Sequence, residues 1–458
     1  MAKIHFGTDG WRAIIGEDFT EPNLARVIEA VAATYQAEFA NQIKSGQDLL
    51  VVGYDCRLEA DRYALLAAQV LQGAGFRVLL SDAYCPTPCL CWTISRNPQA
   101  IGGVMLTSSH NPAEYLGVKL RMPDGGASPK AFTDKLEKLI PDTAAALPQA
   151  EVTTGNIVTP YLEDLLSLVD AQAIAGARLQ VVVDPMFGAG RHYLSKLLRI
   201  LGVAVEEVND AADPTFGGLH PEPIDPWIET GRQAVLKSGA CCGFVNDGDA
   251  DRIGAICADG EFVSPHKILA LVTKHLVAYH HNFGRVVRTQ SGSNLIAALC
   301  EQLGLELTTT PVGFKWIYQE MCKGDVLIGG EESGGIGIPA HVRERDGLLM
   351  ALLLTEMMAV TGKTLRQLVD ALLEQCGDWH YQRRDLKVSP AQIENFKAYA
   401  KAHREGPYDG IKQVSEDGSW LLLRASGTEP LVRIYAEATT DQAVRRLLDE
   451  GEKLATEC

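Results

Sequence analysis

The sequence has no excess of basic residues: 42 Lys and Arg stand against 58 Asp and Glu, for a formal net charge of −16. General nucleic-acid binders need a basic surface that displaces counterions from the phosphates. The charge balance therefore argues against a nucleic-acid partner. An acidic protein can still bind small anions where its Arg and Lys side chains converge on one cleft.

Long apolar segments are also missing. The most apolar stretch, residues 348–360, is too short to span a bilayer and contains Thr355 and Glu356. The first residues lack the basic and apolar regions of a secretion signal. We therefore expect a cytoplasmic protein without a membrane partner.

Paired cysteine motifs are absent as well. The 11 cysteines are an odd number, and the cluster of Cys85, Cys89 and Cys91 has no second pair at the spacing of a zinc finger. Reduced thiols are the expected state, because cytosolic proteins rarely use disulfides.

The sequence does contain a repeat. Hydrophobic residues make up 46% of the 458 positions, enough for several domains with separate cores. The repeated unit occurs three times. In each copy, two apolar strands are joined by a helical segment, and a third strand follows that ends in a polar loop. The strands are expected at residues 49–54, 76–80 and 103–106, then at 179–184, 203–208 and 243–245, then at 285–289, 305–308 and 326–328.

These short Val-, Ile- and Leu-rich segments are typical of parallel strands buried on both faces. With helices between them, such as residues 62–73 and 295–303, they predict three α/β/α layered domains. Two further strands, 420–424 and 432–436, and a helix at 441–454 predict a smaller C-terminal α+β domain. The predicted domains are residues 1–150, 151–257, 258–375 and 376–458.

Ligands of parallel sheets bind beyond the carboxyl ends of the strands, so the loop after each third strand is a candidate site. The first such loop, Thr-Ser-Ser-His-Asn-Pro at 107–112, presents hydroxyl groups that could act as nucleophiles. A turn stabilised by serine or threonine side chains, without chemistry, would have the same composition.

The second loop contains Asp247, Asp249 and Asp251, at alternate positions that can point to one side of an extended segment. An EF-hand is excluded, because Arg252 replaces its glycine and Ala258 its closing glutamate. Three carboxylates with room for a phosphate oxygen favour Mg²⁺, and Arg252 could help to neutralise that phosphate. A solvated acidic turn is the alternative.

Two more loops complete the set. Glu331 and Ser333, in a glycine-rich segment, could bind vicinal sugar hydroxyls, although a flexible turn would look similar. Residues 424–430 combine an arginine, two hydroxyls and a glycine, and Arg433 follows; this composition is typical of a phosphate site or of a plain hairpin turn. Together, the four loops supply the parts that a phosphoryl-transfer enzyme acting on a sugar requires.

With these four motifs in this order, the whole chain resembles the α-D-phosphohexomutase superfamily. The resemblance implies a heart-shaped molecule of four domains around a central cleft, and it assigns roles to individual residues. Ser109 resembles the phosphoserine, which also supplies a metal ligand beside the three aspartates. Lys119 resembles the general acid/base, Arg12 an arginine near the reacting phosphoryl group, and Lys315 a lysine that contacts substrate. The residues implied to bind substrate are Arg252, Lys315, Glu331, Ser333, Arg424, Ser426, Gly427, Thr428 and Arg433.

The chain departs from the superfamily at two positions. Gly335 stands where many relatives have a histidine, and His341 is a candidate substitute. Ser108 stands where alanine is common, and it could be a minor alternative phosphorylation site.

The resemblance implies an isomerase that interconverts hexose 1-phosphate and hexose 6-phosphate. The hexose is expected to be glucose, with mannose second. The implied cofactors are Mg²⁺ and catalytic amounts of a hexose 1,6-bisphosphate as activator. A glucose-1,6-bisphosphate synthase and a catalytically silent sugar-phosphate sensor remain alternatives, and the protein could be a monomer or a dimer.

Overall fold

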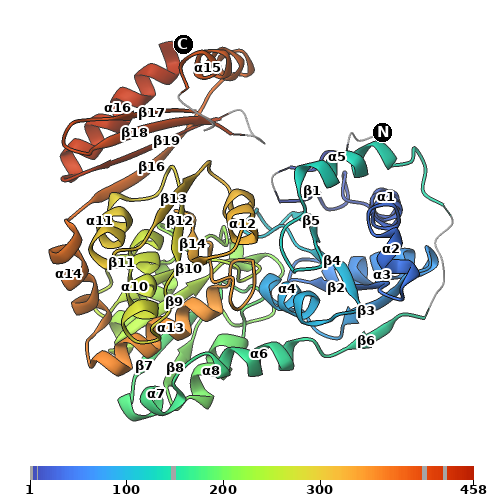
Figure 1. Cartoon of the computed structure of the whole chain (residues 1–458), viewed down its shortest axis with the longest axis horizontal. Helices are drawn as coiled ribbons and strands as arrows, with labels where there is room; N and C mark the ends of the chain where they lie inside the picture. Colours follow the sequence, from blue (N-terminus) through green and yellow to red (C-terminus); the bar gives the residue numbers. More distant parts are fainter. Residues whose placement is uncertain (1–3, 8, 146–150, 405–409, 427–430, 458) are drawn as a thin grey trace. The chain divides into compact units, whose positions relative to one another are not determined.

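Each of the three apolar repeats forms three parallel strands in the computed structural model, which describes residues 4–7, 9–145, 151–404, 410–426 and 431–457 (Figure 1). The first strand of each repeat lies between the other two, in the orders β3-β2-β4, β8-β7-β9 and β13-β12-β14. The bounds of these strands are Leu49–Tyr54 (β2), Arg77–Ser81 (β3), Ala100–Leu106 (β4), Gln180–Asp184 (β7), Ala204–Glu207 (β8), Cys242–Asn246 (β9), Arg285–Thr289 (β12), Leu307–Thr310 (β13) and Val326–Gly330 (β14).

The chain divides into two units, and the first comprises residues 1–264 and 333–366. It contains the sheets β1-β5-β4-β2-β3-β6 and β11-β10-β9-β7-β8. Its other strands are Trp11–Ile14 (β1), Tyr115–Arg121 (β5), Thr153–Gly155 (β6), Ile253–Cys257 (β10), Phe262–Val263 (β11) and Ile336–Gly337 (β15). Its helices are Glu21–Glu38 (α1), Ala40–Lys44 (α2), Ala60–Gly73 (α3), Thr87–Arg96 (α4), Lys130–Leu139 (α5), Val158–Ser167 (α6), Ala171–Ala177 (α7), Tyr193–Ile200 (α8), Phe216–Gly218 (η1, a 3-10 helix), Glu229–Ser238 (α9) and Gly347–Thr361 (α13).

The second unit comprises residues 265–332 and 367–458. Besides the third strand triplet it contains an antiparallel sheet in the order β16-β19-β18-β17. The strands of this sheet are His380–Lys387 (β16), Ile411–Val414 (β17), Trp420–Ala425 (β18) and Leu431–Ala438 (β19). The remaining helices are Pro265–Ala278 (α10), Asn294–Leu303 (α11), Phe314–Cys322 (α12), Leu365–Cys376 (α14), Pro390–His403 (α15) and Asp441–Glu457 (α16).

The predicted fold class, three α/β/α domains followed by a smaller α+β domain, is confirmed. Local signals explain why its elements could be located. The helix expected at 295–303 is α11, which begins where the Ser293 side chain accepts a hydrogen bond from the Leu295 N–H (3.1 Å) and ends at Gly304 in the left-handed conformation.

The most apolar stretch of the sequence forms α13, a helix whose residues 347–358 are all buried in the first unit. It packs on α7, β9 and β10. The charge within this stretch has a structural role, because Glu356 Oε1 accepts a hydrogen bond from the Asp170 N–H (2.6 Å) just before α7. In the described part of the chain, no single helix has the length and hydropathy to cross a membrane. Helices α13 and α14 have the required length and hydropathy only when they are taken together, and the pair is bent between them.

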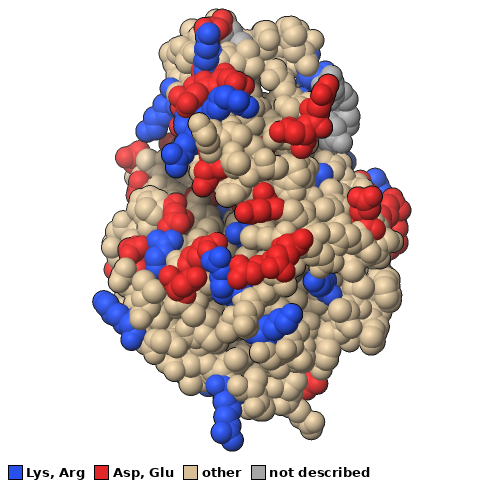
Figure 2. All heavy atoms as spheres, turned by 90° about the vertical axis from the view of Figure 1, so that its left-hand side faces the viewer, with Lys and Arg blue, Asp and Glu red and all other residues tan. Residues whose placement is uncertain are grey.

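Acidic and basic residues are interspersed on the face shown in Figure 2. Exposed ion pairs within one unit include Arg384 with Asp449 (2.9 Å) and Arg366 with Asp259 (3.5 Å). Exposed pairs of this kind contribute little to the free energy of unfolding.

We predict that Leu352→Ala destabilises the first unit by about 2–5 kcal/mol, because it leaves a cavity in the centre of buried helix α13. Urea denaturation followed by circular dichroism measures the change. The control is Leu236→Ala on α9, whose side chain is 47% exposed and whose loss should change the free energy by about 0.5 kcal/mol or less. Equal effects of the two substitutions would show that α13 is not part of the core.

Candidate active site

Ser109 lies three residues beyond the carboxyl end of β4, in a turn that buries its hydroxyl group. The Ser109 N–H donates to Thr107 Oγ1 (2.9 Å), and the backbone adopts the left-handed conformation, with φ of 52°. The hydroxyl donates to Asp247 Oδ2 (3.1 Å). The second loop can come this close because residue 248 is glycine: a Cβ there would lie 2.4 Å from the Ser109 carbonyl oxygen.

The second loop brings the three aspartates together, but not as an extended segment. Residues 247–250 form a turn in which the Ala250 N–H donates to the Asp247 carbonyl (3.0 Å), and Ala250 has φ of 57°. The expectation of an extended loop is therefore wrong, and the turn makes the side chains converge. All three carboxylates are buried, and each has an oxygen within 4.8 Å of the others.

This cluster fits a divalent cation by the chemistry of its oxygens. Among the described residues, Asp249 Oδ1 and Asp251 Oδ1 are buried without a hydrogen-bond donor. Burial, followed by the charges of Asp251 and Asp249, raises the pKa of Asp247 well above its ordinary value. Anionic oxygens that repel one another and lack donors are the ligands that Mg²⁺ and similar hard cations bind.

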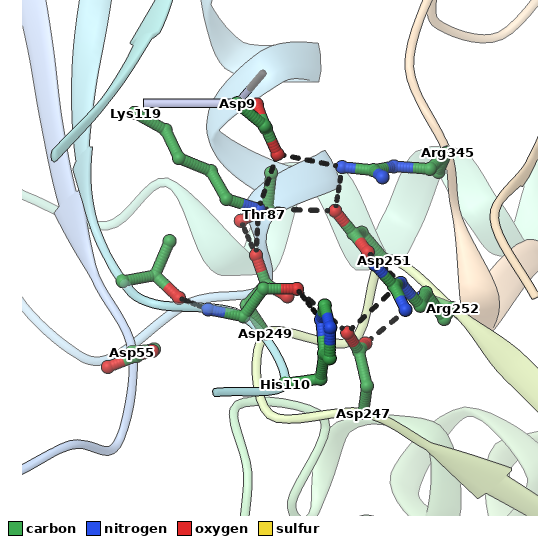
Figure 3. A network of polar contacts seen from close by, with 12 residues as sticks. Asp9, Asp55, Thr87, His110, Lys119, Asp247, Asp249, Asp251, Arg252 and Arg345 are labelled. Carbon is green, nitrogen blue, oxygen red and sulfur yellow. Dashed lines mark hydrogen bonds and ion pairs between the residues drawn. The ribbon is translucent and has the colours of Figure 1, made fainter. Parts of the chain in front are cut away.

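Lys119 on β5 supplies a positive charge at the edge of the carboxylate cluster (Figure 3). Its Nζ lies 2.7 Å from Asp249 Oδ2 and 3.4 Å from Asp251 Oδ2. Burial alone would lower the pKa of Lys119, but the carboxylates of Asp249, Asp9 and Asp251 outweigh it and raise this pKa. The same amine lowers the pKa of Asp249, against the opposing effect of burial. Lys119 is therefore held as an ammonium ion.

Two residues that sequence reasoning missed complete this ionic network. Asp9 lies 3.1 Å from Lys119 Nζ, and Arg345 Nη2 bridges Asp9 Oδ2 (3.1 Å) and Asp251 Oδ2 (2.5 Å) (Figure 3). Asp9 could have been suspected from its place beside Arg12. Arg345 carries no local signal, because its partners lie 336 and 94 positions away along the chain.

Arg12 contacts the Ser109 turn, and Arg252 contacts the Asp247 carboxylate beside it. Arg12, on β1, donates to the side chain of Asn111. The Arg252 N–H donates to Asp247 Oδ1 (3.1 Å), and its guanidinium Nη1 lies 3.6 Å from Glu222 Oε1. His110 Nδ1 lies 3.5 Å from Ser109 Oγ, and burial together with the charge of Arg252 lowers the pKa of His110 well below its ordinary value.

The glycine at position 335 has a structural explanation. A Cβ at Gly335 would lie 2.3 Å from Arg345 Cδ, so the arginine occupies the space that a side chain would need. His341, the candidate substitute for the family histidine, is paired with two carboxylates. Its ring nitrogens lie 3.1 Å from Asp164 and 3.0 Å from Asp346, and these partners raise the pKa of the buried imidazole although burial alone would lower it.

The other predicted substrate residues are distributed over both units. Ser333 begins the second segment of the first unit, whereas Lys315, Glu331, Arg424, Ser426 and Arg433 belong to the second. Arg424 and Arg433 are directly opposite each other on antiparallel strands β18 and β19. Asp385 on β16 is in turn opposite Arg433, with 3.9 Å between Asp385 Oδ2 and Arg433 Nε, and its carboxylate offsets part of the repulsion between the two arginines. Gly427 and Thr428 lie outside the described residues.

Four family models match the chain. They are described as phosphoglucomutase/phosphomannomutase alpha/beta/alpha domains I, II and III, at residues 3–146, 159–260 and 264–376, and as the C-terminal domain of the same family, at residues 384–453.

Similar proteins carry related names. The Thermococcus kodakarensis phosphoglucomutase/phosphomannomutase is 33% identical, and the alignment covers 100% of this chain and 99% of that protein. The Desulforudis audaxviator phosphoglucosamine mutase is 30% identical, with 99% and 98% covered. A solved structure from Thermus thermophilus, named as a phosphomannomutase, is 36% identical, with 99% of both chains covered and a TM-score of 0.86. The relatives thus differ in the hexose that their names specify.

We predict that Asp249→Asn weakens divalent-metal binding by about 10- to 100-fold or more, because it removes one of three anionic ligands. Titration with Mn²⁺, followed by electron paramagnetic resonance, measures the dissociation constant directly. Asp184→Asn is the matched control, since Asp184 is another buried carboxylate at a strand end. It accepts hydrogen bonds from the Met186 N–H and the Asn209 side chain. Equal affinities of wild type and Asp249→Asn would contradict the metal site.

Proposed function

The chain belongs to the phosphoglucomutase/phosphomannomutase family, and we propose that it interconverts hexose 1-phosphate and hexose 6-phosphate through a phosphorylated Ser109. The observation that carries this proposal is the contact of the Ser109 hydroxyl with Asp247, within a buried cluster of carboxylates. Serine hydroxyls are poor nucleophiles unless their surroundings activate them. A hydroxyl placed beside a cation site can accept and return a phosphoryl group.

In the first transfer, a sugar hydroxyl attacks the phosphorus atom of phosphoserine, and the bond from Ser109 Oγ to phosphorus breaks. Lys119, held as an ammonium ion by its carboxylate neighbours, donates a proton to the departing serine oxygen. The resulting amine takes the proton of the attacking hydroxyl, so protons balance and a hexose bisphosphate forms. In the second transfer, its other phosphoryl group returns to Ser109.

Charge stabilisation comes from both sides of the Ser109 turn. Arg12 and Arg252 would neutralise the phosphoryl oxygens. Asp247, Asp249 and Asp251, with an oxygen of phosphoserine, would hold Mg²⁺, which stabilises the charge that spreads over those oxygens when it is bound. Catalytic amounts of a hexose 1,6-bisphosphate would rephosphorylate Ser109 whenever the intermediate escapes.

We assign the phosphate that is not reacting to Arg424, Ser426, Gly427, Thr428 and Arg433. The cross-strand pairing of the two arginines supports this assignment, because two neighbouring guanidinium groups can both donate hydrogen bonds to one phosphate. We assign Lys315, Glu331 and Ser333 to contacts with the sugar and its hydroxyl groups. Glucose is the proposed hexose, with mannose second, because residues 331–335 resemble the sugar loop of phosphoglucomutase/phosphomannomutase relatives.

We predict that Ser109→Ala lowers kcat by several orders of magnitude with an unchanged circular dichroism spectrum. A coupled assay with the 1-phosphates of glucose, mannose and glucosamine measures turnover, and wild type should be fastest with glucose. Ser108→Ala is the control and should retain activity. Full turnover by Ser109→Ala would refute the phosphoserine mechanism, and preference for glucosamine would refute only the choice of hexose.

Arg424→Ala is expected to raise KM for glucose 1-phosphate by about tenfold or more, because a charge-assisted hydrogen bond contributes roughly 1.5–3 kcal/mol. kcat should fall less than KM rises. The matched control is Arg384→Ala, which removes an arginine of the same sheet that pairs with Asp449 at the surface. If Arg424→Ala leaves KM at the wild-type value, Arg424 does not bind the substrate phosphate.

A further inference from the structure

The Arg57 guanidinium lies beneath the Ser109 turn and donates to four backbone carbonyl groups. Its Nη2 donates to the carbonyls of Ser109 (2.7 Å) and Asn111 (2.6 Å). Its Nη1 donates to those of Pro112 (2.7 Å) and Tyr115 (2.9 Å). The four acceptors extend from the nucleophile to the start of β5, so one side chain holds the whole turn.

Arg57 is itself held from two other directions. Its Nε lies 3.3 Å from Asp55 Oδ2, and neither side chain is exposed to solvent. The Phe216 ring of the second repeat covers the guanidinium, with 4.9 Å between Arg57 Cζ and the ring centroid. Asp55 is in turn fixed at the end of β2, where its N–H donates to the Leu106 carbonyl (3.1 Å). The guanidinium is therefore locked in one orientation.

The turn requires such a support because its geometry is unfavourable for the residues that form it. Ser109 adopts a left-handed backbone conformation that residues other than glycine rarely adopt, at a cost that the surroundings must offset. Its carbonyl oxygen faces both Gly248 and the guanidinium. A turn that relaxed would move Ser109 Oγ away from Asp247, and a displacement of about 1 Å can lower the rate of group transfer by about 100-fold.

We propose that Arg57 is a positioning residue that sets the place of the Ser109 hydroxyl by binding the carbonyl groups of its turn. The inference rests on the proposed function of Ser109 as nucleophile. The guanidinium donates its hydrogen bonds to backbone carbonyls, so Arg57 acts on Ser109 through the backbone. Lysine cannot replace it, because one ammonium nitrogen has three donors and cannot reach acceptors that two separate guanidinium nitrogens serve.

The test compares Arg57→Lys with Arg191→Lys. Arg191 is another buried arginine of the same unit that also lies on an aromatic ring: its Nη1 donates to the Ala211 carbonyl (2.7 Å), and its Cζ lies 4.9 Å from the centroid of the Tyr84 ring. Arg57→Lys should cost more stability than Arg191→Lys, because it loses more hydrogen bonds, so kcat is measured well below the melting temperature of either variant. Only Arg57→Lys should lower kcat, by about 10- to 100-fold, with KM for glucose 1-phosphate within about twofold of wild type.

A second measurement uses Arg57→Ala with free guanidinium at concentrations far below those that denature proteins. The cation should restore part of kcat by entering the space beside Asp55, whereas ammonium should not, because it lacks the planar set of donors. Selective rescue would separate positioning from a loss of folded protein.

Three outcomes would overturn the inference. They are a wild-type kcat in Arg57→Lys, an equal fall of kcat in Arg191→Lys, and the absence of guanidinium rescue in folded Arg57→Ala. The proposed function fails differently, since Ser109→Ala would then remain active. If Ser109→Ala is inactive but Arg57→Lys keeps the wild-type kcat, only the role of Arg57 is refuted.

Discussion

Three buried carboxylates within 4.8 Å of one another are the constraint around which the first unit is organised. Like charges in a medium of low dielectric constant repel strongly, so such a cluster persists only where positive charge surrounds it. Lys119, Arg252 and Arg345 supply part of that charge within the chain. Two carboxylate oxygens without hydrogen-bond donors remain for a cation. In the proposed mechanism, a cation at this cluster and the neighbouring arginines would also stabilise an anionic phosphoryl group on Ser109.

The sequence predicted the repeated strands well, because parallel strands buried on both faces leave a local pattern of consecutive Val, Ile and Leu. The Ser109 and Asp247 loops were found because they follow directly on such strands. Arg345 could not be found in this way, since only the folded chain brings it to Asp9 and Asp251. Arg57 follows the end of β2, where the strand-end rule applies, but nothing local indicates that it binds the carbonyls of a distant turn. The expected extended acidic loop was wrong because alternation along the sequence does not specify a backbone conformation.

Arg345 and Gly335 illustrate how one side chain can account for a departure from the superfamily pattern. The arginine fills the volume next to the glycine and pairs with Asp9 and Asp251, so it contributes to the ionic network. His341, paired with Asp164 and Asp346, belongs to a separate buried group that also receives the Tyr161 hydroxyl (2.8 Å to Asp346) and caps α13. One segment of chain therefore contributes to two separate groups of paired charges, Arg345 to the carboxylate network and His341 to the group around Asp346.

The central claim is that the phosphoryl group of Ser109 is the one delivered to the sugar. Protein carrying ³²P on Ser109 is mixed with unlabelled glucose 1-phosphate in the presence of Mg²⁺, quenched within single turnovers, and separated into protein, hexose bisphosphate and hexose monophosphate. The account predicts that label leaves Ser109 at least as fast as kcat, enters the bisphosphate first and is then found at the 6-position of the product. Product formation while the label stays on Ser109, or release of the label as inorganic phosphate, would contradict it.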